Sequence, residues 1–143
     1  AAVVYDPVHV ELFHAIYGMG AYVNGKRIEP SKTSGIEEAV VSLDHAALRS
    51  KEVTALVEAA GQIRVTPVAA LELCYVACGR VDAALRHGAA FFDCAAGMLV
   101  AMEAGAVVTD GRGGAVSFNE YGQRCDVAAI APGLAEDFAR YYR

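Results

Sequence analysis

The sequence lacks the features that mark several large classes of protein. It has no basic tract, since 12 Lys and Arg stand against 17 Asp and Glu, and its net charge is −5 at pH 7. That charge balance does not suggest nucleic acid or a membrane surface as a partner, and it suits a cation site as well as plain solubility. No apolar run is long enough to cross a bilayer, and no signal peptide is recognisable. We therefore expect no nucleic-acid partner and no membrane partner.

Cysteine is scarce, and its spacing fits no zinc or redox motif. Cys74, Cys78, Cys94 and Cys125 lie in apolar surroundings without a C-x-x-C pair. Cys74 and Cys78 would share a helix face, but a zinc site needs two more ligands at suitable spacing, and none is evident. The pattern favours small buried side chains in a reduced, cytoplasmic compartment.

Motifs of common hydrolases and nucleotide-binding proteins are missing as well. There is no G-x-S-x-G and no P-loop, so a serine hydrolase or a nucleoside triphosphatase has no support. Gly18 and Gly20 suggest a nucleotide-binding loop only weakly, because no third glycine falls at the fingerprint spacing and no helix is expected to follow. A lone loop histidine such as His87 is more often solvated or hydrogen-bonded than catalytic.

The sequence does contain the elements of one layered domain. Apolar residues make up 55% of the 143 residues, and a chain of this length buries about two thirds of its unfolded surface. Short strand-like runs alternate with helical periodicity, and Asn24–Gly25 indicates an early hairpin. We expect an α/β domain over residues 1–143, with a mixed, largely parallel sheet flanked by helices and an N-terminal antiparallel hairpin.

The expected elements follow from these patterns. Glu72 is expected on the outer face of its helix, and Asp82 is expected to make a polar contact at the start of a strand. Strands are expected at residues 2–5, 11–17, 39–43, 62–65, 81–85, 106–109, 116–118 and 126–131. Helices are expected at 46–60, from 68 or 69 to 78, at 94–104 and from 132 to 142.

Residues 92–106 are the most informative stretch. Asp93 precedes nine consecutive residues without a polar side chain, and Gly105 stands where a helix would end. Such a helix must be covered on more than one side. Asp93 is either its N-cap, accepting the backbone N–H near Ala96, or a ligand for Mg²⁺. Glu103 cannot share that ion, because ten helical residues separate the two carboxylates by roughly 15 Å.

Two other places offer chemistry. At residues 66–70 a strand is expected to turn into a helix, where free backbone N–H groups can meet an anion or a sugar hydroxyl, although most such turns bind nothing. Arg86 lies seven residues before Asp93. It is either a surface residue that closes a strand or a contact for an anion.

The motif around Asp93 carries a family resemblance. The run Phe92-Asp93-x-Ala95-Ala96-Gly97-x-Leu99-Val100-Ala101-x-x-x-Gly105-Ala106 resembles the C-terminal signature of the inositol monophosphatase family. These are Mg²⁺-dependent, lithium-sensitive phosphatases of inositol and sugar phosphates. In that family the Asp of this motif binds a catalytic metal, so the resemblance favours Asp93 as a metal ligand and Mg²⁺ as the cofactor. The family usually has Trp where this chain has Phe92.

The resemblance also implies substrate contacts. The strand-to-helix junction often reads Gly-Ser/Thr-Ala in the family and contacts the substrate, whereas Pro67-Val68-Ala69 has no hydroxyl. Only backbone contacts from Val68 and Ala69 therefore carry over. Arg86 stands where animal-type members have a Glu that holds the inositol ring, and a guanidinium suits a second phosphate or another anion. A sugar phosphate or bisphosphate is therefore expected in preference to plain inositol monophosphate, and no residue is assigned as a catalytic acid or base.

The resemblance covers only the C-terminal half of that family. The family's Asp-Pro-(Ile/Leu)-Asp-Gly-Thr motif and an upstream Glu have no counterpart, because Asp6-Pro7 is followed by Val8-His9. The chain also opens without Met on an apolar, strand-like run. We expect a C-terminal domain that is inactive without its N-terminal metal-binding half and that forms a homodimer when intact. The alternative is a non-catalytic binding or assembly module of the same fold.

Overall fold

A computed structural model describes residues 1–118 and 122–142, which form two sheets and five α-helices. One sheet contains β1 (Ala2–Asp6), β2 (Glu11–Ile16), β3 (Gly20–Val23) and β4 (Lys26–Arg27), and the other contains β5 (Val40–Leu43), β6 (Gln62–Val65), β7 (Ala83–Ala90), β8 (Val107–Thr109) and β9 (Arg124–Ile130). The helices are α1 (His45–Leu48), α2 (Thr54–Ala59), α3 (Ala69–Ala77), α4 (Phe91–Ala104) and α5 (Ala135–Tyr141), with 3₁₀ turns at Ile36–Glu38, Lys51–Val53 and Pro132–Leu134.

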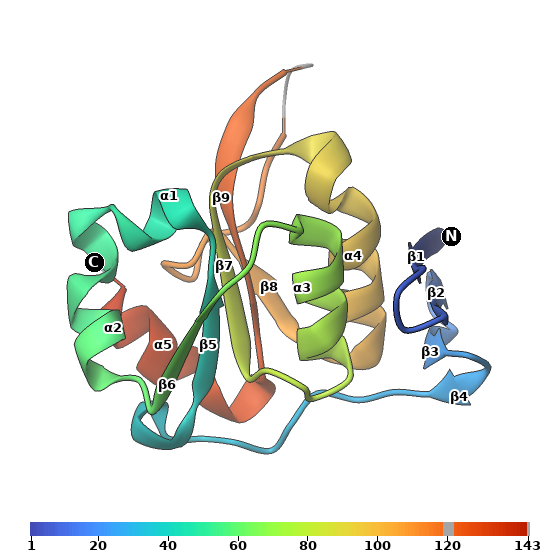
Figure 1. Ribbon diagram of the computed structural model, residues 1–143, viewed down its shortest axis with the longest axis horizontal. Helices are drawn as coiled ribbons and strands as arrows, with labels where there is room; N and C mark the ends of the chain where they lie inside the picture. Colours follow the sequence, from blue (N-terminus) through green and yellow to red (C-terminus); the bar gives the residue numbers. More distant parts are fainter. Residues whose placement is uncertain (119–121, 143) are drawn as a thin grey trace.

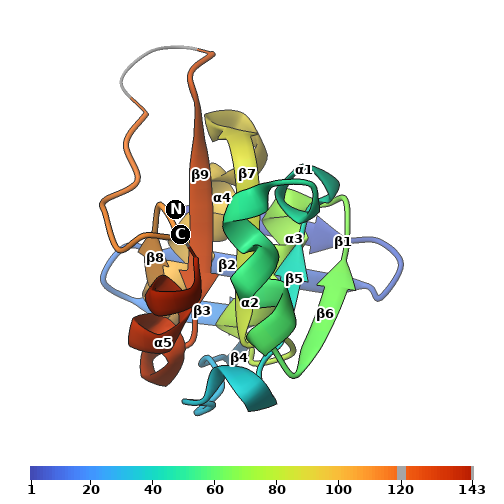
Figure 2. The ribbon, with the colours of Figure 1, turned by 90° about the vertical axis from the view of Figure 1, so that its left-hand side faces the viewer.

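These elements stack in four layers (Figure 1). Helices α1, α2 and α5 lie on one side of the five-stranded sheet, and Figure 2 shows α2 and α5 in front of its strands. Helices α3 and α4 lie between the two sheets, and the four-stranded sheet packs on their far side. Two cores result, one on each face of the five-stranded sheet. None of the described helices has the length and apolar character needed to cross a bilayer.

The four-stranded sheet contains the predicted hairpins. Its strands run in the order β1-β2-β3-β4, and all its pairings are antiparallel. The β3–β4 turn is formed by Asn24 and Gly25 at φ values of 48° and 77°, both positive as a type I′ turn requires. The predicted N-terminal antiparallel hairpin is confirmed and belongs to this larger sheet.

The five-stranded sheet is mixed, as predicted, but it is not largely parallel, because two of its four pairings are antiparallel. Its order is β6-β5-β7-β9-β8, in which β5 pairs in parallel with β6 and β7, while β9 pairs antiparallel with β7 and β8. The carboxyl ends of β5, β6 and β7 therefore meet at one edge. In an α/β sheet this edge is where ligands bind.

Helix α4 is the central element between the two sheets. Its buried residues are Cys94, Gly97, Val100 and Ala101, and it ends at Gly105 with φ 102°, as the sequence predicts. A Cβ at Gly97 would lie 2.7 Å from the Ala70 carbonyl oxygen, so only glycine lets α3 and α4 approach this closely.

Residues 46–60 do not form the single helix that their periodicity predicts. Asp44 accepts a hydrogen bond from the Ala47 N–H at 2.6 Å, and Ser50 accepts one from the Glu52 N–H at 3.2 Å. These side chains cap two separate helical starts, α1 and the 3₁₀ turn that leads into α2. Residues 116–118 form no strand, and the Phe118 ring instead contacts the Phe91 ring edge-on at 5.2 Å between centroids.

The weak suggestion of a nucleotide-binding loop at Gly18 and Gly20 is wrong. Their backbone N–H groups donate to the Glu103 carboxylate at 2.8 and 2.9 Å. These hydrogen bonds lower the pKa of Glu103. They also occupy the two backbone N–H groups that a phosphate would have to contact in a nucleotide-binding loop. Asp82 makes the polar contact expected of it, accepting hydrogen bonds from the Ser31 hydroxyl and the Val40 N–H.

Candidate functional site

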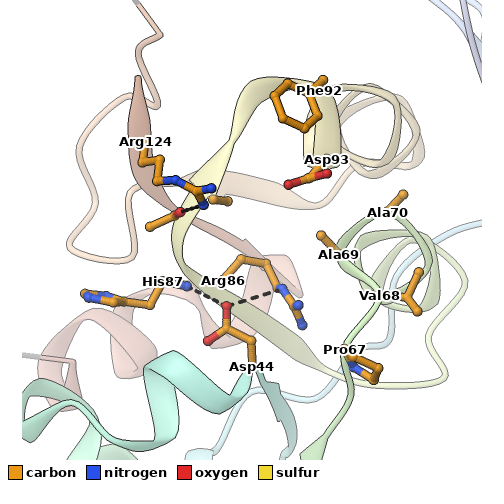
Figure 3. A pocket seen from close by; sticks show the side chains of 12 residues that line it. Asp44, Pro67, Val68, Ala69, Ala70, Arg86, His87, Phe92, Asp93 and Arg124 are labelled. Carbon is orange, nitrogen blue, oxygen red and sulfur yellow. Dashed lines mark hydrogen bonds and ion pairs between the residues drawn. The ribbon is translucent and has the colours of Figure 1, made fainter. Parts of the chain in front are cut away.

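A cavity of about 450 Å³ opens at the edge where β5, β6 and β7 end (Figure 3). It brings together all four residues that the sequence singles out as metal or substrate contacts: Asp93, Arg86, Val68 and Ala69. The lining is completed by Asp44, Pro67, Ala70, His87, Gly88, Ala89, Phe92 and Arg124.

Asp93 does not cap α4. The helix begins at Phe91 with Ala90 as its N-cap, no side chain caps it, and Asp93 lies inside the first turn. The N-cap interpretation is therefore wrong. The Asp93 carboxylate is exposed and points into the cavity (Figure 3), where it has no hydrogen bond or ion pair with any described residue. This carboxylate is therefore open to a cation that enters the cavity.

Arg86 is not the surface residue that one interpretation of the sequence allowed. It is 5% exposed on β7, and its Nη1 donates to the Thr66 carbonyl oxygen at 2.8 Å. Its Nε lies 3.7 Å from Asp44 Oδ2 and has no hydrogen-bond partner among the described residues. The guanidinium lines the cavity with part of its hydrogen-bonding capacity unused.

Asp44 is a site residue that the sequence reasoning missed. Its Oδ1 accepts the Ala47 N–H at 2.6 Å, and its Oδ2 accepts the His87 N–H at 3.0 Å and pairs with Arg86. These contacts occupy the carboxylate and hold Arg86 beside it. The available signal was position, because Asp44 directly follows a buried strand whose carboxyl end lies at the binding edge of the sheet.

Arg124 was missed for a different reason. It is the first residue of β9, which the sequence pattern starts only at residue 126. Its Nη1 donates to the Gly88 carbonyl oxygen at 2.9 Å, and Figure 3 shows its side chain beside the cavity. A second guanidinium therefore contributes to the lining.

The start of α3 supplies backbone donors. Val68 is the N-cap, it makes no side-chain cap hydrogen bond, and the first intrahelical bond runs from the Glu72 N–H to the Val68 carbonyl oxygen. The N–H groups of Ala69 and Ala70 therefore have no acceptor within the helix. They lie on the lining of the cavity, where an anion or a hydroxyl can accept them.

His87 faces a second polar cluster beside the cavity. Its Nδ1 lies 3.0 Å from Asp126 Oδ1, while the Tyr142 hydroxyl donates to Asp126 Oδ2 at 2.6 Å. Burial opposes ionisation of Asp126, but the hydrogen bonds from Tyr142 and the Gly88 N–H outweigh it and lower the pKa of Asp126. The irregular part of β7 next to Arg86 is thus fixed by two carboxylates: Asp44 accepts the His87 N–H and Asp126 accepts the Gly88 N–H.

The Asp93 carboxylate is a suitable donor for Mg²⁺, but one carboxylate does not complete the coordination of the ion. A carboxylate without competing partners is the donor that this ion prefers. Within residues 1–118 and 122–142, two groups of side chains could jointly hold an ion, Asp6/His9/Glu11 and Glu52/His87/Asp126, and neither includes Asp93. The Asp93 carboxylate is thus compatible with a magnesium site for which this chain would supply one protein ligand.

Comparison with known proteins decides the family. The model of the inositol monophosphatase family matches residues 1–142. This chain belongs to the inositol monophosphatase family. Among its relatives, the Nus factor SuhB of Vibrio cholerae is 38% identical over 138 residues, which cover 92% of this chain and 50% of that protein. The inositol monophosphatase 2 of Solanum lycopersicum is 38% identical over 122 residues, which cover 78% of this chain and 45% of that protein.

A solved structure has the same fold. The extragenic suppressor protein suhB of Bartonella henselae superposes with a TM-score of 0.87 at 31% identity, covering 99% of this chain and 55% of that one. The chain thus spans about half the length of the curated relatives that it matches.

Proposed function

We propose that this chain forms part of a Mg²⁺-dependent phosphomonoesterase that acts on an inositol or sugar phosphate. The observation that carries the proposal is the Asp93 carboxylate, which is free of partners among the described residues and faces an open cavity. Around the same cavity lie the Arg86 guanidinium and the free N–H groups at the start of α3. Membership of the inositol monophosphatase family supports a phosphatase-type function.

Each residue then has a stated task. Asp93 would hold Mg²⁺, and the ion when bound supplies a Lewis acid and an activated water for attack on phosphorus. Arg86 binds a negatively charged oxygen of the substrate, and Asp44 keeps the guanidinium in place. The N–H groups of Ala69 and Ala70 bind a phosphate oxygen or a sugar hydroxyl at the helix start.

A bisphosphate is the substrate class that the charges on the cavity favour. Arg86 and Arg124 both line it, and Arg86 is buried with its Nε unpaired. One phosphate near Asp93 leaves these guanidinium groups available for a second anionic group.

We further propose that polypeptide outside residues 1–143 completes the site. The relatives are about twice as long as this chain, and one carboxylate is too few ligands for a catalytic metal. By itself the chain is expected to be inactive. The homodimer and the cytoplasmic location stay predictions.

A non-catalytic binding or assembly module is the second candidate. Several relatives carry the name Nus factor, which does not describe a phosphatase. The free carboxylate of Asp93 favours the enzyme, because a module without metal chemistry has no need of an unpaired acid in an open cavity.

The test is phosphate release by the complete polypeptide that contains this chain. Release should require Mg²⁺ and be inhibited by lithium, and Asp93→Asn should reduce kcat at least ~100-fold. Glu136→Gln, on the exposed side of α5, is the matched control and should leave kcat unchanged. Release that is absent with Mg²⁺, or that Asp93→Asn does not alter, would favour the binding module.

A further inference from the structure

Glu72 is a buried acid without a partner. It lies in the first turn of α3 and is 3% exposed, although the sequence pattern predicts an outer position. Within residues 1–118 and 122–142, no hydrogen bond or ion pair involves its carboxylate. Its carboxylate oxygens are not among the fully enclosed side-chain atoms that lack a partner, so the little surface that Glu72 keeps includes them. An acid in this state can take a cationic partner that reaches this surface.

The Glu72 side chain lies on a cavity of its own. This cavity has a volume of about 240 Å³ and lies between α3 and the turn that joins β1 to β2. Its walls are mostly apolar and include Val8, Val68, Leu71 and Tyr75. We call it the Glu72 cavity.

The other polar groups on the Glu72 cavity already have partners. Asp6 accepts hydrogen bonds from the Val8 N–H, the His9 ring and the Tyr75 hydroxyl. The Thr66 hydroxyl is hydrogen-bonded to the Ser42 hydroxyl at 3.0 Å. Glu72 is therefore the group on this lining whose charge is unmatched among the described residues.

The basic side chains of the neighbouring elements are also engaged elsewhere. Arg80 forms two hydrogen bonds with Glu11, at 2.6 and 2.7 Å. Arg86 is bound to the Thr66 carbonyl oxygen, and the Nδ1 of His9 lies 2.6 Å from Asp6. The cation that matches Glu72 must come from outside the described chain.

The surroundings of the Glu72 cavity indicate what carries that cation. Val8 is 82% exposed and Val68 47%, so apolar side chains lie at its rim. Pro67 and Val68 line both this cavity and the one that contains Asp93. A segment seated here would lie beside the candidate active site.

We propose that the Glu72 cavity binds a Lys or Arg side chain from a polypeptide segment with apolar flanks, and that this segment belongs to the polypeptide outside residues 1–143. An aliphatic stem suits the apolar walls while its charged head pairs with Glu72. The relatives are about twice as long as this chain, which leaves room for such a segment. The inference rests on the proposed completion of the site, but its test does not use phosphatase activity, so the two can fail separately.

The first experiment titrates this chain with capped peptides and follows amide resonances by NMR. Acetyl-Leu-Arg-Leu-amide should shift the resonances of Val8, Leu71 and Tyr75 and bind at least ~10-fold tighter than acetyl-Leu-Gln-Leu-amide. Glu72→Gln should abolish that preference, whereas the matched control Glu58→Gln, on the exposed face of α2, should keep it. A preference that survives Glu72→Gln overturns the proposal, as does agmatine binding as tightly as the Arg peptide, which would indicate a small cation.

The second experiment compares the melting temperatures of two polypeptides that carry Glu72→Gln. In this chain alone, removing an unmatched buried charge should raise the melting temperature or leave it unchanged. In the complete polypeptide, removing the partner of a basic side chain should lower it. A change of the same sign in both would mean that Glu72 has only a structural role or takes a partner from another molecule, and would overturn the proposal.

Discussion

Asp44 and Asp93 lie on the same cavity but differ in what their oxygens contact. Asp44 accepts two backbone N–H groups and pairs with Arg86, so it organises the wall of the cavity. Asp93 has no such contacts with the described residues and remains available to a ligand. Nothing in the sequence around either residue separates these roles, because both stand close to a helix start.

Arg86 is the residue through which we expect substrate preference to change. In the complete polypeptide, Arg86→Gln should raise KM for a sugar bisphosphate ~10- to 100-fold, because a charged hydrogen bond of about 1.5–3 kcal/mol is lost. KM for the matching monophosphate should change much less. Steady-state kinetics on both substrates measure the difference.

The control for that substitution is Arg64→Gln, which removes an exposed guanidinium on β6 outside the cavity. It should leave both KM values unchanged. If Arg86→Gln raises the two KM values equally, or neither of them, then Arg86 does not select between substrates.

Asp6 is expected to make stability depend on pH in acid. The His9 side chain, followed by the N–H groups of His9 and Val8, lowers the pKa of Asp6 to about 2 against the opposing effect of burial. The unfolded value is about 3.9, so the ionised Asp6 stabilises the fold fully above that pH. This contribution is lost as the pH falls through about 2.

Chemical denaturation between pH 5 and pH 2 measures this loss. The free energy of unfolding should fall over that range, and Asp6→Asn should make the fall shallower because residue 6 no longer titrates. The exposed Glu58→Gln should reproduce the original slope. An unchanged slope in Asp6→Asn would place the acid sensitivity elsewhere.

Helix α4 shows what can be learned from pattern at the scale of an element. Its apolar run and Gly105 predict its existence and its end. Its start is different, because acidic residues are favourable both as N-caps and inside the first turn. The extended backbone at Ala90, which sets the start, leaves no mark in composition. The prediction of one helix over residues 46–60 is wrong for a similar reason, since Ser50 caps a new turn inside an apparently continuous helical pattern.

Gly97 should be the position on α4 least able to accept a side chain. By helix propensity alone, Gly97→Ala would stabilise α4 by about 1 kcal/mol. The new Cβ, however, would lie 2.7 Å from the Ala70 carbonyl oxygen and 2.9 Å from the Leu73 Cβ. Separating α3 from α4 should cost more, and we expect a net loss of about 1–3 kcal/mol in the free energy of unfolding, measured by urea denaturation.

A substitution at Gly105, at the end of the same helix, serves as the comparison for Gly97→Ala. A Cβ at Gly105 meets no atom within 4 Å, but the residue has φ 102°. Gly105→Asn should therefore cost less than Gly97→Ala, because Asn tolerates the left-handed region. A stabilised Gly97→Ala would mean that α3 and α4 do not pack this closely.

At the scale of the whole molecule, the candidate site joins segments that no local pattern connects. Asp44, Val68, Arg86, Asp93 and Arg124 come from five different elements or junctions and meet at one edge of the sheet. Strand alternation predicts the mixed sheet. The family resemblance supplies three of these five positions, Val68, Arg86 and Asp93, but not Asp44 or Arg124. The order β6-β5-β7-β9-β8 that places them together depends on long-range pairing, which composition and periodicity do not encode.

Binding of Mg²⁺ should separate this chain from the complete polypeptide. In this chain the cavity presents one free carboxylate, and Mg²⁺ gives up its water reluctantly, so a Kd of 10 mM or weaker is expected. At 10 mM MgCl₂ such binding stabilises the fold by less than about 0.4 kcal/mol. In the complete polypeptide further ligands should give a tighter site, and a free ion concentration 100 times Kd would stabilise it by about 2.7 kcal/mol. Thermal unfolding with and without MgCl₂, against NaCl of equal ionic strength, measures the stabilisation of this chain and of the complete polypeptide. Asp93→Asn should remove the larger stabilisation, which is expected in the complete polypeptide. A large shift in this chain alone would show that its own residues suffice to hold the ion.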